Sequence, residues 1–274
     1  MSEVINIKIK QFEPDKMIPD KNCLIIGPQY SGKTHLLKNL LYYINAPFGI
    51  LVHPNEFATE TYGNMLPKQC KLDEINKDTL HKFCNRSRTL IEFNKRYDRR
   101  LDGQACLIMD NCVPDLIDMK WDKNPDFKFL FRAGKDANIS TIITAPYPLK
   151  MPQHYLSAID YVFILRDTNK KNKKMLFDMF GGMFDSLEQF TSVMNQCTAD
   201  HGCMVIDCTK LSGNLNDSVY WYKAPRELRK FYMGSPKLWE MCINSSITLD
   251  ELLMEPLRLF SKNSSSSSSS RSKH

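Results

Sequence analysis

Residues 22–41 read NCLIIGPQYSGKTHLLKNLL, and this stretch decides the fold. A short apolar segment, Cys23 to Ile26, precedes a loop with a glycine near each end, and leucines at helical spacing follow the loop. The loop matches the pattern Gly-x4-Gly-Lys-Thr, a P-loop that cradles phosphates with backbone N–H groups. The sequence therefore predicts a buried strand, a phosphate-binding loop and an amphipathic helix in direct succession.

Each residue type in this loop meets a demand of a bound triphosphate. Gly27 and Gly32 carry no Cβ, so the loop can curl and the phosphates can approach the main chain. Lys33 is expected to reach the β and γ oxygens, and the Thr34 hydroxyl to ligate Mg²⁺ above the positive end of the helix. We therefore expect ATP and Mg²⁺ to bind at Gly27, Pro28, Gln29, Tyr30, Ser31, Gly32, Lys33 and Thr34.

The composition is that of a globular protein without an extreme charge. The chain has 274 residues, of which 42% are hydrophobic and 25% charged, and its formal net charge is +6. This mild excess favours acidic partners without requiring them. We find no apolar run of about 18 residues and no secretory leader pattern, so neither a membrane span nor secretion is expected. Nine cysteines without a Cys-x-x-Cys pair indicate reduced core thiols in a cytosolic compartment.

A second apolar segment delivers a carboxylate at its end. Residues 105–109 read ACLIM and are followed by Asp110 and Asn111. Downstream of a P-loop, such an aspartate holds the Mg²⁺ hydration shell opposite Thr34, so we expect Asp110 to serve the metal and, with Lys33, the chemistry. In oligomeric ATPases of the additional-strand type a second acid usually follows and polarises the attacking water. Asn111 stands there, and its amide orients water by hydrogen bonding without taking a proton.

The rest of the chain alternates apolar strands with amphipathic helices. The order predicts an α/β fold, a P-loop NTPase of the RecA/FtsK-like additional-strand type with a mostly parallel sheet and helices on both faces. Thr144 ends one strand and is the candidate γ-phosphate sensor, although a threonine there is equally ordinary in a β-strand. An edge strand is expected at 4–9, further strands at 49–52, 140–144, 161–165, 203–207 and 219–222, and helices at 78–97, 126–134 and 169–180.

Composition also suggests how the chain is divided. We expect an ATPase domain at 1–224, a C-terminal helical extension at 225–262 and a disordered serine-rich tail at 263–274. The helix at 78–97 and the residues after it carry a basic face. Plain solvation of such a face is more common than contact with DNA, and both interpretations stay open. The face comprises Arg86, Arg88, Lys95, Arg96, Arg99 and Arg100.

Taken in order, the motifs resemble the poxvirus-type genome-packaging ATPases of large nucleocytoplasmic DNA viruses, relatives of the FtsK/HerA translocases. The resemblance implies a homo-oligomeric ring that hydrolyses ATP to drive double-stranded DNA into a capsid without sequence preference. It also implies capsid or packaging proteins as partners, no membrane, and a location in the host cytoplasm or the virion. It rests on the P-loop, LIMDNC at 107–112, IIT at 142–144 with Tyr147, IDYVF at 159–163, GGMF at 181–184 with Phe190, and VYWYKA at 219–224.

Several positions depart from the pattern of that family. The second acid is Asn111, an Asn-Gly-Arg-His segment is AGKD at 133–136, a sensor Gln is Pro146, and an Arg is Leu156. Loss of a water-polarising acid commonly costs about 10²- to 10⁴-fold in rate, whereas binding depends on the intact loop. Two functions therefore stay open: a DNA-packaging motor, or a catalytically weakened nucleotide-binding subunit with a structural or regulatory role in virion assembly. Arg166 and Arg132 are the arginine-finger candidates.

Overall fold

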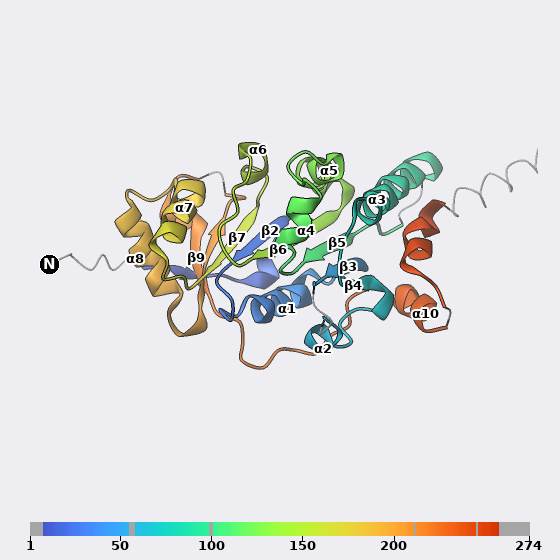
Figure 1. Cartoon of the computed structure of the whole chain (residues 1–274), viewed down its shortest axis with the longest axis horizontal. Helices are drawn as coiled ribbons and strands as arrows, with labels where there is room; N and C mark the ends of the chain where they lie inside the picture. Colours follow the sequence, from blue (N-terminus) through green and yellow to red (C-terminus); the bar gives the residue numbers. More distant parts are fainter. Residues whose placement is uncertain (1–7, 55–57, 99–100, 211, 245, 258–274) are drawn as a thin grey trace, which may run out of the picture.

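The computed structural model describes residues 8–54, 58–98, 101–210, 212–244 and 246–257. In these residues, nine strands form one sheet in the order β1-β9-β8-β7-β2-β6-β5-β3-β4 (Figure 1). The strands are β1 (Lys10–Gln11), β2 (Asn22–Ile26), β3 (Phe48–Val52), β4 (Lys71–Leu72), β5 (Ala105–Met109), β6 (Ile139–Ala145), β7 (Tyr161–Leu165), β8 (Cys203–Asp207) and β9 (Val219–Tyr222).

The centre of the sheet is parallel. β2 pairs with β6 on one side and β7 on the other, and β6, β5, β3 and β4 continue in parallel. Only β8 runs antiparallel to its neighbours among the described strands. The central strands are buried along their whole length, which explains why their sequences are continuous apolar runs rather than alternating ones. β6 lies between the P-loop strand and the Asp110 strand, so the additional-strand prediction is confirmed.

Helices cover both faces of the sheet. α1 and α2 lie on one side, and α3, α5 and α6 on the other (Figure 1). A further helical segment occupies 249–257. The helices are α1 (Lys33–Ile44), α2 (Ala58–Tyr62), α3 (Lys77–Tyr97), α4 (Val113–Asp118), α5 (Pro125–Ala133), α6 (Gln153–Leu156), α7 (Lys170–Phe180), α8 (Leu187–Cys197), α9 (Leu215–Ser218) and α10 (Pro236–Asn244).

One hydrophobic core joins the sheet to the C-terminal helices. The buried face of α1 packs on it, and so do Met233, Leu238, Leu252 and Leu253 from beyond residue 224. A Cβ on Gly49 of β3 would lie 2.9 Å from Met233 Cε, so the C-terminal segment fits closely against the sheet. The division into an ATPase domain and a helical extension stays a prediction, and the serine-rich tail lies outside the described residues.

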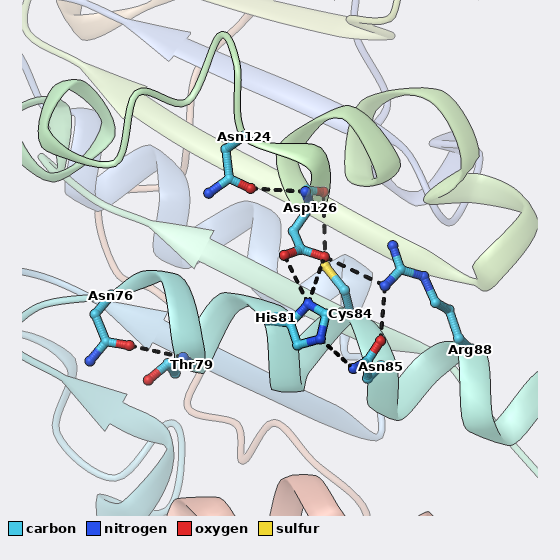
Figure 2. A network of polar contacts seen from close by, with 8 residues as sticks. All are labelled: Asn76, Thr79, His81, Cys84, Asn85, Arg88, Asn124 and Asp126. Carbon is cyan, nitrogen blue, oxygen red and sulfur yellow. Dashed lines mark hydrogen bonds and ion pairs between the residues drawn. The ribbon is translucent and has the colours of Figure 1, made fainter.

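A polar network pins α5 to α3 (Figure 2). Asp126, only 6% exposed, lies 3.1 Å from His81 Nδ1 and 3.5 Å from Arg88 Nη1. Asn85 joins these two partners, since its side chain contacts His81 Nε2 at 2.8 Å and accepts a hydrogen bond from Arg88 at 2.9 Å. The N-cap Asn124 accepts from the Asp126 backbone N–H at 2.8 Å. The buried carboxylate is thus paired, as its burial requires, at the helix end where the dipole favours negative charge.

The basic face expected on α3 is only partly open. The Arg86 guanidinium lies 3.9 Å from the centre of the Phe48 ring, and that of Arg88 lies 3.9 Å from the centre of the Phe129 ring. These two guanidinium groups therefore pack against aromatic rings and do not form one solvent-exposed basic face. Arg99 and Arg100 lie outside the described residues, as do residues 1–7, which hold most of the expected edge strand at 4–9.

Candidate functional site

The loop between β2 and α1 is held in shape by its glycines. The Gly27 backbone N–H donates to Ala145 O at 3.1 Å. A Cβ on Gly27 would lie 2.6 Å from Ser31 Oγ and 2.8 Å from Leu165 Cβ, so no larger residue fits. Gly32 has φ of +99°, a left-handed conformation that favours glycine. Both glycines of the P-loop motif are therefore required by geometry.

Two polar side chains inside the loop differ in their hydrogen bonds. Lys33 Nζ donates to the carbonyl oxygens of Gly27 and Pro28 at 2.7 and 2.8 Å. Burial lowers the pKa of Lys33, although the charge of Asp110 opposes this shift. The buried Ser31 hydroxyl has no hydrogen-bond partner among the described residues. An orphan buried hydroxyl beside a lysine and the first N–H groups of a helix fits a phosphate-binding loop.

Asp110 follows β5 and is surrounded by hydroxyl groups. Its Oδ2 accepts hydrogen bonds from the Thr34 hydroxyl at 3.1 Å and the Tyr62 hydroxyl at 2.6 Å, and its Oδ1 accepts from the Thr144 hydroxyl at 2.6 Å. Burial raises the pKa of Asp110, but the contact with His53 and the bonds from Thr144 and Tyr62 outweigh it and hold the pKa below its ordinary value. Asp110 is therefore a carboxylate at neutral pH.

His53 stands at the end of β3, beside Asp110. Its Nδ1 lies 3.2 Å from Asp110 Oδ2, an ion-pair distance, without the alignment of a good hydrogen bond. The carboxylate raises the pKa of His53, and burial of the ring opposes that shift. His53 was not predicted as a site residue. The signal was available, because His53 directly follows an apolar strand in the same way that Asp110 does.

The loop and Asp110 both line a cavity of about 670 Å³, a size within the range of about 300–1,000 Å³ for small-molecule sites. Of the predicted site residues, seven line this cavity: five from the loop and the two strand-end residues Asp110 and Asn111. Thr144 lies behind Asp110 instead, and its hydroxyl also accepts from the Asn111 backbone N–H at 3.0 Å. The cavity is lined by Gln29, Tyr30, Gly32, Lys33, Thr34, His35, His53, Thr61, Asp110, Asn111 and Pro146.

Asn111 occupies the cavity wall in a left-handed conformation, with φ of +61°. Asparagine tolerates this region better than most residues, and its side chain is exposed at the cavity. Asp110 is the only carboxylate among the described residues that line this cavity. Neither Arg132 nor Arg166 lines it. Among the described residues, the cavity lining thus brings Lys33, Thr34 and Asp110 together and contains no second acid.

The oxygen donors suit a magnesium ion that arrives with a triphosphate. Thr34 and Asp110 present two hard oxygen ligands 3.1 Å apart. The described part of the chain contains no group of three or more His, Cys, Asp or Glu that would form a protein cage for a metal. In nucleotide sites Mg²⁺ is held by one or two protein oxygens together with phosphates and water. The residues therefore fit Mg²⁺ in that manner.

The strand order, with β6 between the P-loop strand and the strand before Asp110, defines an α/β P-loop NTPase fold of the additional-strand type. The genome packaging NTPase of Sulfolobus turreted icosahedral virus 2, in complex with ATP-gammaS, superposes with a TM-score of 0.51 at 14% identity over 76% of this chain and 98% of that one. The DNA-packaging ATPase of Sulfolobus Turreted Icosahedral Virus gives 0.51 at 15% identity over 77% and 100%. The expected resemblance to viral packaging ATPases is confirmed at the level of the fold.

Sequence relatives come from large DNA viruses. The chain is 29% identical over 238 residues to an uncharacterized protein of Acanthamoeba polyphaga mimivirus, covering 85% of this chain and 82% of that protein. An uncharacterized protein of Invertebrate iridescent virus 6 is 25% identical over 240 residues, covering 82% and 89%. No family model matches the sequence. Within the described residues, every helix is too short or too polar to cross a bilayer.

Proposed function

We propose that this protein is an ATPase that binds Mg·ATP at the P-loop and uses hydrolysis to translocate double-stranded viral DNA into capsids. The observation that carries the proposal is the cavity in which Lys33 and Thr34 face the ionised Asp110. A lysine, a ring of N–H donors and a carboxylate-held metal are the parts that phosphoryl transfer needs. Complexes of fold neighbours with ATP-gammaS and AMPPCP support the choice of nucleotide.

The DNA partner and the oligomer belong to the same proposal. The likeness to packaging ATPases supports a homo-oligomeric ring that contacts DNA through its phosphates, together with capsid or packaging proteins as partners, in the host cytoplasm or the virion. Phosphate contacts carry no sequence information and weaken steeply with salt. No arginine lines the cavity among the described residues, which is consistent with an arginine finger supplied by a neighbouring subunit, with Arg166 or Arg132 as the candidates.

A second function is favoured by one feature of the cavity wall. Asn111 and Pro146 line it where the resembling family carries an acid and a sensor Gln. A cavity with intact phosphate and metal donors but no second acid suits a nucleotide-binding subunit with slow turnover and a structural or regulatory role in virion assembly. In the motor, Asn111 orients the attacking water and Thr144 acts on the nucleotide through Asp110.

A single-turnover assay with DNA present separates the two functions. The motor predicts ATP cleavage that Lys33→Ala abolishes, because the β and γ oxygens lose their cation. The regulatory subunit predicts tight binding of ATP without cleavage. A matched control is Lys128→Ala, which removes an exposed lysine of α5 outside the cavity lining. Equal loss in both lysine variants would argue against the site.

The variant Asn111→Asp tests the role of the missing acid. Restoring a carboxylate beside Asp110 is expected to raise the rate of cleavage by about 10²-fold or more if Asn111 is a lesion. Asn111→Ala, which removes the amide, is the matched comparison and is expected to lower any residual rate. A flat or reduced rate in Asn111→Asp would show that the asparagine is the working residue.

A further inference from the structure

A second cavity adjoins the first at the P-loop. It measures about 540 Å³ and shares Tyr30, Gly32 and His35 with the first cavity. Asp110 and Asn111 do not line it. The two cavities therefore meet at the edge of the loop, and only one of them contains the residues that face a γ-phosphate and its metal.

The far wall of the second cavity comes from segments distant in the sequence. One is the turn at Ala199–His201, and the other is the segment 222–232, which we call the strap, running from β9 past α1 toward α10 (Figure 1). Leu36 and Leu165 are buried side chains of the lining. Buried apolar side chains with a polar rim at one edge are typical of a site for a small organic ligand.

The strap is fixed to the P-loop helix at three points. His35 Nε2 lies 2.8 Å from Pro225 O, Tyr222 donates to Asn39 Oδ1 at 2.5 Å, and Arg229 donates to the Tyr42 hydroxyl at 3.0 Å. Positions 35, 39 and 42 follow one face of α1. The cavity wall is therefore held in place by the same helix whose first turn lies under the phosphates.

The opposite rim is locally strained. Asp200 and His201 have φ of +48° and +60°, left-handed values that are uncommon for residues other than glycine. Lys223 of the strap pairs with the Asp200 carboxylate across the cavity mouth. Strain of this kind persists where the surrounding structure imposes it, and it gathers at ligand sites.

The direction of a bound nucleotide follows from these positions. Lys33 and Asp110 place the proposed γ-phosphate and metal in the first cavity, and the edge that it shares with the second cavity offers a path for the other end of the nucleotide. Tyr30 stands at that edge with its side chain 95% exposed, which offers an aromatic face for stacking. The lining combines the buried Leu36 and Leu165 with charged groups, namely the Lys223–Asp200 pair and Arg226. The apolar side chains suit a base, and the charged groups suit polar atoms of the ligand.

We infer that the second cavity binds the nucleobase and ribose, with Ala224 and Arg226 of the strap as residues that determine nucleotide affinity. This inference rests on the proposed function and extends it, because it makes the C-terminal strap a part of the nucleotide site. Arg226 and Ala224 both line the cavity and neither belongs to the P-loop motif.

Calorimetric titration with Mg·ATP and with Mg·tripolyphosphate tests the inference. Ala224→Trp fills the cavity and is expected to weaken ATP binding about tenfold or more while changing tripolyphosphate affinity less than about twofold. Glu227→Trp is the control, since this exposed strap residue lines neither cavity. Unchanged ATP affinity in Ala224→Trp, or equal losses for both ligands, would overturn the inference.

Photolabelling of the wild-type protein with 8-azido-ATP keeps the test valid if Ala224→Trp does not fold. Cross-links are expected in peptides spanning 199–203 or 222–226, and competition by ATP should remove them. Labels confined to other peptides would overturn the inference and leave the proposed function standing. Wild-type protein that binds neither ATP nor tripolyphosphate would overturn the proposed function, which is a different result from loss of base binding alone.

Discussion

Two buried aspartates in this chain each lie beside a histidine, and they have different surroundings. Asp110, 1% exposed, follows a parallel strand and lines the cavity at the P-loop. Asp126, 6% exposed, lies in the first turn of α5 and is enclosed by side chains of α3 (Figure 2). Both carboxylates have the partners that burial demands. The comparison teaches that a buried carboxylate next to a histidine marks a site only where a cavity adjoins it.

The largest expected effect separates the two carboxylates by function. Asp110→Asn should lower the ATP hydrolysis rate by at least about 10²-fold, because the metal loses its charged ligand. The protein should still fold, since the hydroxyls of Thr34, Tyr62 and Thr144 can turn to meet an amide, although His53 loses its charged partner. Phosphate release measures the rate. Asp126→Asn makes the same change of atoms and is the matched control. Equal losses of hydrolysis rate in both variants would show that the two carboxylates do not differ in function.

The next effect concerns stability at the second carboxylate. Asp126→Ala should reduce the free energy of unfolding by about 2 kcal/mol, as α5 loses its contact with His81 and Arg88. This loss of unfolding free energy is smaller than that expected for a fully buried ion pair, because the His81 and Arg88 side chains are 56% and 38% exposed. Urea unfolding measures it. Asp178→Ala, at the exposed Lys174 pair, should cost far less. A change of similar size there would contradict the assignment.

A smaller effect is expected at the N-cap beside Asp126. Asn124→Ala removes the acceptor for the Asp126 backbone N–H and should cost about 1 kcal/mol in unfolding free energy. ATP hydrolysis should be unchanged, because α5 does not line the cavity. The exposed Asn216→Ala serves as control. A loss of activity without a loss of stability would place α5 in the functional site.

The smallest effect is a dependence of stability on pH at the first carboxylate. Asp110 raises the pKa of His53, so the protonated ring stabilises the fold fully below its unfolded pKa of about 6.5, and this contribution is lost as pH rises through the higher folded pKa. The free energy of unfolding of the wild type should therefore fall as the pH rises above about 6.5. The fall should be smaller in His53→Gln. Chemical denaturation across pH measures it. An identical slope in the variant would show that His53 is not coupled to Asp110.

The P-loop, Asp110 and the additional strand could be predicted because each follows from a local pattern. Apolar strands buried on both faces have to be continuous runs, and their carboxyl ends meet at one edge of a parallel sheet. Tyr62 could not be predicted as a partner of Asp110, since 48 residues separate them and α2 is a short helix without a clear apolar period. β4 was missed for a similar reason, as two residues carry no pattern.

The arginines of α3 show a different reason for failure. Spacing placed Arg86 and Arg88 on a polar face, and spacing cannot reveal that Phe48 and Phe129 from other elements offer rings to their guanidinium groups. Long basic side chains have apolar stems, so the same residue suits a solvated face or a packed one. Contacts between distant elements decide whether such a side chain is solvated or packed, and these contacts form only in the folded chain.

The fastening of the strap along α1 has a mechanical consequence. A segment tied at positions 35, 39 and 42 cannot slide along the helix, because a shift of one residue would break all three ties together. A rotation of α1 would therefore have to move residues 222–229 with it or break these contacts. The C-terminal segment is thus tied to the position of the P-loop helix.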